Sequence, residues 1–257
     1  MKDSTIIMLA GQGSSTQILY NALKSDFTIA RVIIEEPVPT LHFLQRRIKK
    51  LGLGRVVGQI LFQAIVVSWL QIRSKHRKME IIDQFQLRTE PLDTALVTNV
   101  QSVNSDTAMQ LLEEINPDIV IISGTRIISA KTLNCTSAKF INIHAGITPM
   151  YRGVHGGYWS LVENHKDLCG VTVHLVDPGI DTGSILAQGI IEPKEEDNFV
   201  TYPLLQLAKG LELLKRVLVD ELEDRLHVQA DPEGTSRLWS HPTILQYIGY
   251  RVRRGVR

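Results

Sequence analysis

The sequence predicts an α/β protein built on a doubly wound, mostly parallel sheet, with a helical insertion and a short C-terminal extension. Two observations predict this fold class. Short apolar runs, typical of strands, alternate in the first half of the chain with segments that read as helices, and Gly-, Asn- and Pro-containing turns separate them, as in βαβ units. Residues 119–122 are apolar at every position, which is typical of a central parallel strand. We therefore expect the site at the carboxyl ends of the strands.

The elements of the first half follow from local patterns. Asn104–Asp106 supplies N-cap candidates for one helix, and Asn116-Pro117 ends that helix. The expected strands are residues 5–10, 27–34, 97–100, 119–122 and 140–144. The expected helices are residues 16–24 and 107–115.

The second half changes character. Residues 171–176 alternate between apolar and polar positions, as an antiparallel strand would, and residues 184–191 are expected to pair nearby. A long amphipathic helix is predicted over residues 202–222. The remaining residues are expected to be rich in loops, with Trp239, Tyr247 and Tyr250 pinning the terminus. We divide the chain into a catalytic domain, residues 1–200, and a C-terminal helix and extension, residues 201–257.

Residues 36–92 form the predicted helical insertion. Within it, Val56–Ile72 carries no charge and has basic residues on both sides. We favour a helix packed on the body of the protein, and the alternative is a helix lying on an anionic membrane surface.

The composition of the 257 residues is that of an ordinary globular protein, with 44% hydrophobic and 21% charged residues. The net charge of +1 argues against a general nucleic-acid binder. Cys135 and Cys169 form neither a disulfide framework nor a zinc signature, which indicates a cytoplasmic protein. The sequence leaves the oligomeric state open, and a homodimer is compatible with it.

Three side chains stand out as candidate catalytic residues. Asn142 and His144 are two apart at the end of a predicted strand, so they point to the same face. Asp181 follows on a loop marked by glycine and proline. An amide donor, an imidazole and a carboxylate are the groups that an acyl transfer requires.

The pattern resembles the folate-dependent formyltransferases, which include glycinamide ribonucleotide, methionyl-tRNA and sugar N-formyltransferases. Asn142-Ile143-His144, Pro149, Gly153, His174, Asp181 and Gly124–Ile128 carry the resemblance, which is strong from about residue 116 to 192. It implies a Rossmann-like fold, catalysis by Asn142, His144 and Asp181, 10-formyltetrahydrofolate as co-substrate, and no metal. It implies that the folate contacts are Arg126, Ile127, Ile128, Val176, Asp177 and Asp181.

On the acceptor side, the turn after the first strand presents backbone N–H groups to a phosphate. The predicted substrate-binding residues are Gly11, Gly13, Ser14, Ser15, Arg152 and His174. The resemblance implies transfer of a formyl group to a small-molecule amine, and the long insertion with the aromatic, basic tail favours an amino sugar on a nucleotide as that amine. Phosphoribosylglycinamide is the alternative acceptor. Hydrolysis of formyltetrahydrofolate and folate binding at a membrane without turnover are further alternatives.

Overall fold

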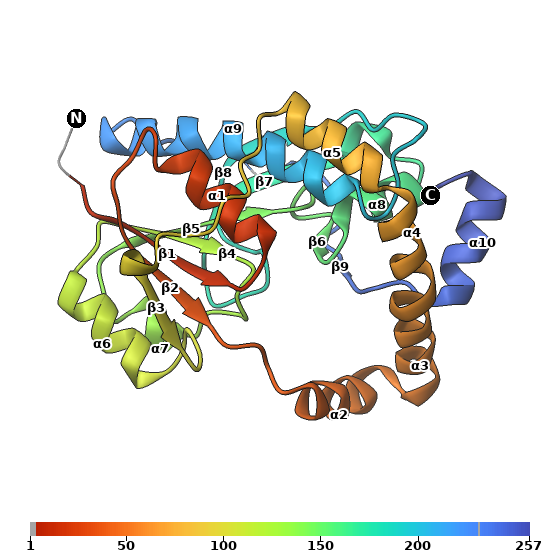
Figure 1. The fold of residues 1–257 in the computed structure, drawn as a ribbon, viewed down its shortest axis with the longest axis horizontal. Helices are drawn as coiled ribbons and strands as arrows, with labels where there is room; N and C mark the ends of the chain where they lie inside the picture. Colours follow the sequence, from red (N-terminus) through yellow and green to blue (C-terminus); the bar gives the residue numbers. More distant parts are fainter. Residues whose placement is uncertain (1–3, 231) are drawn as a thin grey trace.

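The structure is a computed structural model that describes residues 4–230 and 232–257, with side chains described for all of these except 40–43. Its centre is a seven-stranded sheet in the order β3-β2-β1-β4-β5-β7-β8 (Figure 1). The strands are β1 (Ile6–Gly11), β2 (Ile29–Glu35), β3 (Val97–Val100), β4 (Ile119–Ser123), β5 (Lys139–His144), β7 (Gly170–Leu175) and β8 (Ile185–Ile190). The first five are parallel, and β7 and β8 are antiparallel, as predicted.

Helices cover both faces of the sheet, so the doubly wound prediction is confirmed (Figure 1). One face carries α1 (Ser14–Leu23) and α9 (Tyr202–Leu222), which bury Met8 of β1. The opposite face carries α6 (Asp106–Ile115), whose Leu112 shares a cluster with Leu9. The alternation of side chains along β1 therefore supplies both cores. The smaller helices are α7 (Ala130–Leu133) and α8 (Gly156–Val162), and short 3-10 turns lie at Thr94–Leu96 and Lys166–Leu168.

The predicted insertion is helical between β2 and β3. It contains α2 (Thr40–Leu51), α3 (Leu53–Leu61), a π-helical turn η1 (Phe62–Val67), α4 (Ser68–Arg73) and α5 (Lys75–Gln84). Phe62 is fully buried and packs edge-on against Phe199, at 4.8 Å between ring centroids. The prediction of a packed helix therefore holds for the face that carries Phe62, whereas Ile65 on the other side is 56% exposed.

The C-terminal extension differs from the prediction, because it contains an ordered helix, α10 (Ile244–Arg254). A capping box begins this helix: the Thr243 hydroxyl accepts from the Gln246 N–H, and the Gln246 side chain accepts from the Thr243 N–H. Before it, the two-residue strands β6 (Arg152–Gly153) and β9 (Leu238–Trp239) pair in parallel. Trp239 stacks on Trp159 at 4.7 Å, so the aromatic residues pin the terminus as predicted.

Candidate active site

The end of β5 brings the predicted amide and imidazole to one face of the sheet. Antiparallel pairing sets Asn142 opposite His174 and His144 opposite Thr172. Side chains opposite each other in such a pair lie on the same face, so four polar side chains gather where the parallel and antiparallel parts of the sheet meet. All four are buried or half-buried.

The loop after β7 carries Asp181 to this point. Asp177 builds the loop, since its carboxylate accepts from the Gly179 N–H (3.0 Å) and from the Thr182 hydroxyl (2.7 Å). Gly183 passes so close to the Leu175 carbonyl oxygen that a Cβ would lie 1.7 Å from it. Asp181 itself adopts a left-handed conformation, φ 51°, which aspartate tolerates better than most residues. These contacts fix the direction of its carboxylate.

Asp181 lies between two histidines. Its Oδ2 is 3.4 Å from Nδ1 of His144 and accepts a hydrogen bond from the Gly153 N–H at 2.9 Å. Its Oδ1 is 3.8 Å from Nε2 of His174. The carboxylate is therefore within direct or water-bridged reach of both rings, which is the convergence that the sequence predicted.

Hydrogen bonds define the state of His174. Its Nδ1 donates to the Leu175 carbonyl at 2.7 Å, and its Nε2 is 3.2 Å from the Asn142 amide nitrogen. Burial lowers the pKa of His174, so the ring is neutral near pH 7 and its Nε2 accepts from Asn142. Asn142 thus donates one side-chain N–H to His174, and its other N–H is left for a substrate oxygen.

His144 is held differently from the prediction. Its Nε2 donates to the Tyr151 carbonyl at 2.7 Å and its Nδ1 faces Asp181, so both ring nitrogens have partners within the protein. The side chain is 6% exposed. This arrangement holds the His144 ring against the Asp181 carboxylate, and the expected role of second donor to the formyl oxygen stays a prediction.

A cavity of about 270 Å³ opens beside these groups. Asn142, His174 and Asp181 line it, and His144 lies behind Asp181. The walls include every residue predicted to contact folate: Arg126, Ile127, Ile128, Val176, Asp177 and Asp181. Asn142, Asp181 and the predicted folate residues therefore share one pocket at the carboxyl end of the sheet, whereas His144 is not part of its lining.

Arg126 has a structural role at this pocket. Its Nε lies 2.6 Å from the Glu35 carboxylate, and its guanidinium also donates to the carbonyls of Glu36 and Gln101. Glu35 is buried and accepts from the Arg126 and Val103 backbone N–H groups as well. Arg126 therefore ties the end of β2 to the pocket wall, and its guanidinium is already engaged on one side.

The predicted phosphate turn lies next to the pocket and does not line it. Helix α1 begins at Ser14 after Gly13, φ 152°, with no side-chain cap, so its first N–H groups face outward. Gly11 packs so closely on the Gly124 carbonyl oxygen that a Cβ would lie 2.5 Å away. Of the other predicted substrate residues, His174 lines the pocket, whereas Arg152 donates to the Ile180 carbonyl at 3.1 Å.

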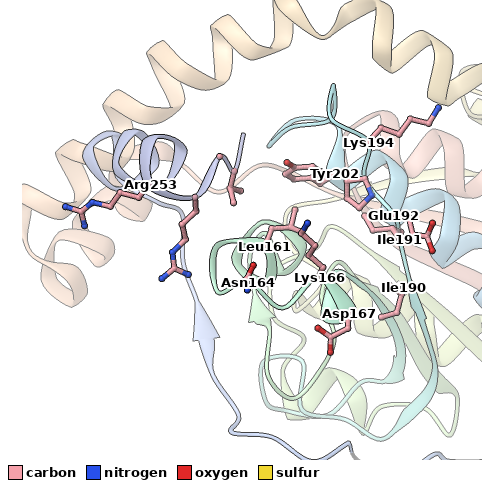
Figure 2. Close-up of a pocket in the computed structure, with 14 residues that line it drawn as sticks. Leu161, Asn164, Lys166, Asp167, Ile190, Ile191, Glu192, Lys194, Tyr202 and Arg253 are labelled. Carbon is pink, nitrogen blue, oxygen red and sulfur yellow. The ribbon is translucent and has the colours of Figure 1, made fainter.

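A larger hollow of about 950 Å³ lies elsewhere, between the end of β8, the loop after α8 and the C-terminal end of α10 (Figure 2). Lys166, Asp167, Glu192 and Arg253 lie around it, and none of the predicted site residues does. Among the described residues, no three His, Cys, Asp or Glu side chains are grouped to hold a metal ion.

Two groups that hold the site could not be found from side-chain patterns. The Tyr151 carbonyl that fixes His144 and the Gly153 N–H that fixes Asp181 both belong to the backbone. The sequence shows only that residue 153 is a glycine, and the structure gives the reason, because this residue adopts φ 93°, a conformation that favours glycine.

These features define an α/β protein with a cluster of an amide, two imidazoles and a carboxylate at the carboxyl end of its sheet. Residues 53–217, more than half of the chain, match the family model described as formyl transferase. The chain belongs to the formyl transferase family.

Among curated relatives, the methionyl-tRNA formyltransferase of Caldanaerobacter subterraneus subsp. tengcongensis is 30% identical over 135 residues, which is 51% of this chain and 43% of that protein. That of Thermodesulfovibrio yellowstonii is 30% identical over 127 residues, 49% of this chain and 39% of its own length. The matches thus span less than half of these relatives.

Solved structures share the fold at low identity. A sugar N-formyltransferase from a Shewanella species superposes with a TM-score of 0.55 at 17% identity, covering 90% of this chain and 75% of that one. Glycinamide ribonucleotide transformylase 1 from Symbiobacterium toebii superposes with a TM-score of 0.58 at 18% identity, covering 90% and 93%. The predicted Rossmann-like formyltransferase fold is confirmed.

Proposed function

We propose that the protein is an N-formyltransferase that moves the formyl group of 10-formyltetrahydrofolate to a primary amine in the cytoplasm. One observation carries the proposal: Asp181 lies 3.4 Å from His144 and 3.8 Å from His174, beside Asn142, on the wall of a pocket with apolar residues such as Ile122 and Ile128. Family membership supports it. The pocket size, about 270 Å³, fits the ring end of a folate better than the whole molecule.

The residues divide the chemistry between them. Folate supplies a formyl group that is already bonded to nitrogen, so the amine nitrogen attacks its carbon and the old carbon–nitrogen bond breaks. The free N–H of Asn142 donates to the formyl oxygen, where negative charge develops, and such a donor is worth about 10²–10³ in rate. Asp181, directly or through a water molecule, accepts the proton that the attacking amine loses and returns it to the departing folate nitrogen. His144 and the Gly153 N–H hold the carboxylate for both steps.

For the acceptor we propose a phosphate-bearing amino sugar, with phosphoribosylglycinamide as the alternative. The N-terminus of α1, open beside Gly11 and Gly124, supports a phosphate on the acceptor. Solved structures of both kinds of enzyme share the fold, so the fold does not choose between them.

A screen tests the proposal directly. The purified chain is incubated with 10-formyltetrahydrofolate and a panel of amines, which includes nucleotide-linked amino sugars and phosphoribosylglycinamide, and the products are analysed by mass spectrometry. We expect one acceptor to gain the mass of a formyl group in place of a hydrogen. Release of formate at the same rate without any acceptor would instead identify a hydrolase. The absence of both a formylated acceptor and released formate would contradict enzymatic turnover.

A further inference from the structure

The insertion presents an apolar helix that the body of the protein covers on one face only. One continuous helix, Leu53–Arg73, runs through α3, η1 and α4, and it is long and apolar enough to cross a membrane by length and composition. Only 22% of its most apolar stretch is buried. The buried face is anchored, because Phe62 packs into an aromatic cluster and the Gln59 side chain donates to the His241 carbonyl. A helix anchored in this way lies along the surface of the protein and does not span a bilayer.

The opposite face is a continuous apolar stripe in solvent. Steps of three or four residues separate its members, apart from one five-residue step at the π-helical turn, where each turn of helix holds an extra residue. The stripe consists of Leu53, Val57, Ile60, Ile65, Trp69 and Ile72, which are 62%, 44%, 45%, 56%, 49% and 78% exposed. A surface helix ordinarily turns its apolar stripe inward, so an outward stripe marks an interaction surface.

The neighbouring helix α10 exposes a second apolar row. It lies beside α3 (Figure 1), and the two approach so closely that a Cβ on Gly58 would lie 2.9 Å from Thr243, the N-cap of α10. Leu245, Ile248 and Val252 follow helical spacing along α10 and are 79%, 48% and 79% exposed. Two neighbouring helices thus expose apolar rows, with Arg253 and Arg254 beside the second row.

The charge of the same region is strongly asymmetric. Residues 37–79 contain nine Lys or Arg and no Asp or Glu. The rest of the chain therefore holds 19 Lys and Arg against all 27 Asp and Glu, a net charge of −8, and the overall value of +1 conceals this division. Most of the nine are exposed, including Lys49 and Lys50 of α2 and Arg55 and Arg73 at the two ends of the apolar helix. Arg77 is the buried exception.

We propose that the apolar stripe and the basic residues around it form a docking surface for an anionic lipid membrane, with the helix Leu53–Arg73 lying in the plane of the headgroups. The stripe would enter the boundary between headgroups and acyl chains while the flanking cations pair with lipid phosphates. A second copy of the chain fits this surface poorly, since two such faces would bring like charges together. A nucleic acid would leave the apolar stripe uncovered.

Vesicle binding by the full chain tests this proposal. Vesicles of phosphatidylcholine alone and vesicles with about 30% phosphatidylglycerol are compared by co-sedimentation. We expect binding to the anionic vesicles only, and weaker binding as salt rises from about 0.1 M to 1 M, because the Debye length falls from about 10 to 3 Å. Trp69 supplies an internal reporter, since Trp159 is buried and Trp239 is half-buried and stacked on it. The emission of Trp69 should shift to the blue on binding, and Trp69→Phe should remove the shift.

Matched variants separate the two parts of the surface. Ile65→Asp places a charge in the stripe and should abolish binding, whereas Val228→Asp, at an exposed apolar residue outside the surface, should not. Lys49→Gln with Lys50→Gln should lower the partition coefficient about 25-fold, on the basis of about fivefold for each cation near an anionic surface. The control is Lys24→Gln with Lys131→Gln, which leaves residues 37–79 unchanged.

Three results would overturn the proposal. One is the absence of binding to anionic vesicles at low salt. Another is equal binding by the wild type and Ile65→Asp, with both proteins shown to be folded by circular dichroism. The third is a concentration-dependent dimer in analytical ultracentrifugation that Ile65→Asp dissociates, without vesicle binding, because the stripe would then be covered by a second copy.

Discussion

Replacing Arg77 with methionine should lower the free energy of unfolding more than any surface substitution nearby. Arg77 of α5 forms a two-pronged ion pair with Asp197, at 2.9 Å from Nε to Oδ1 and 3.0 Å from Nη2 to Oδ2. The Asp197 side chain is 0% exposed and that of Arg77 is 9% exposed. Methionine keeps much of the apolar volume and removes the cation, so a buried carboxylate is left without its partner.

The size of the effect follows from that burial. Breaking a buried ion pair by removal of one partner costs about 3–5 kcal/mol. The Lys194 N–H still donates to Asp197 at 2.8 Å, which places the expected loss near the lower end, about 3 kcal/mol. Lys75→Met on the exposed face of the same helix should change stability by less than about 0.5 kcal/mol.

The ion pair of Arg77 and Asp197 also predicts how the stability of the protein depends on pH. Burial alone would raise the pKa of Asp197, but hydrogen bonds from Arg77 and Lys194 outweigh it, so the pKa lies below its ordinary value. The pair therefore stabilises the protein fully above the unfolded pKa of about 3.9, and this stability is lost as the pH falls through the folded pKa. In Arg77→Met, burial should dominate and raise the pKa of Asp197, so that acidification recovers part of the loss.

Urea unfolding at pH 7 and pH 5, followed by circular dichroism, measures these differences. A loss of less than about 1 kcal/mol in Arg77→Met, or a loss equal to that of Lys75→Met, would refute the reasoning, since neither agrees with the cost of an unpaired buried charge.

Three further substitutions test other parts of the structure. Ser14→Asp should raise the KM of the acceptor through repulsion of its phosphate, and an unchanged KM would remove the phosphate turn from the account. Gly146→Ala should lower kcat, because the new Cβ would lie 2.2 Å from the Tyr151 carbonyl oxygen that holds His144. The control is Gly249→Ala, where a Cβ would have no atom within 4 Å. Equal kcat values for the two variants would count against the role of the Tyr151 carbonyl. His155→Asn should reduce the loss of stability on acidification. Burial, and to a smaller extent the neighbouring His241, lowers the pKa of His155 to about 3, so the unfolded chain takes up a proton below about pH 6.5 that the folded chain does not. An unchanged slope of the unfolding free energy against pH between pH 6.5 and 4 would contradict this reasoning.

The sheet could be predicted because each of its strands is a short apolar or alternating run that can be recognised from the local sequence. Residues 97–100 and 202–222 were placed to the residue, and the other main elements differ from the prediction by one or two residues at their ends. Such shifts are expected where capping decides the boundary.

The errors lie where packing, or a short signal, decides the structure. Helix α10 was expected to be loop, although Thr243 followed by Gln246 is a readable capping box. Its inward face carries Ile244, Tyr247 and Tyr250, which pack in the aromatic cluster. Leu245 and Val252 face solvent, so apolar residues lie on both sides of the helix and obscure the single stripe by which helices are usually recognised. The strands β6 and β9 are two residues long and far apart in the chain, and no local sequence pattern predicts that they pair.

For the candidate site, the sequence supplied the side chains and the structure supplied their arrangement. Spacing within a strand placed Asn142 and His144 together, and the loop marked by glycine and proline, together with the family resemblance, indicated Asp181. The direction in which His144 points could not be predicted, because the backbone carbonyl of Tyr151, in the loop that follows β5, determines it.

The catalytic role of Asp181 is the central claim, and one comparison tests it most directly. Formyl transfer to the acceptor found in the screen is measured for the wild type and for Asp181→Asn, which keeps the shape of the side chain, and folate affinity is measured for both by fluorescence titration. We predict a similar Kd for folate and a kcat lower by about 10²–10⁴, the usual contribution of a positioned acid–base group. A kcat for Asp181→Asn within a few-fold of the wild type, in a folded protein, would contradict the account.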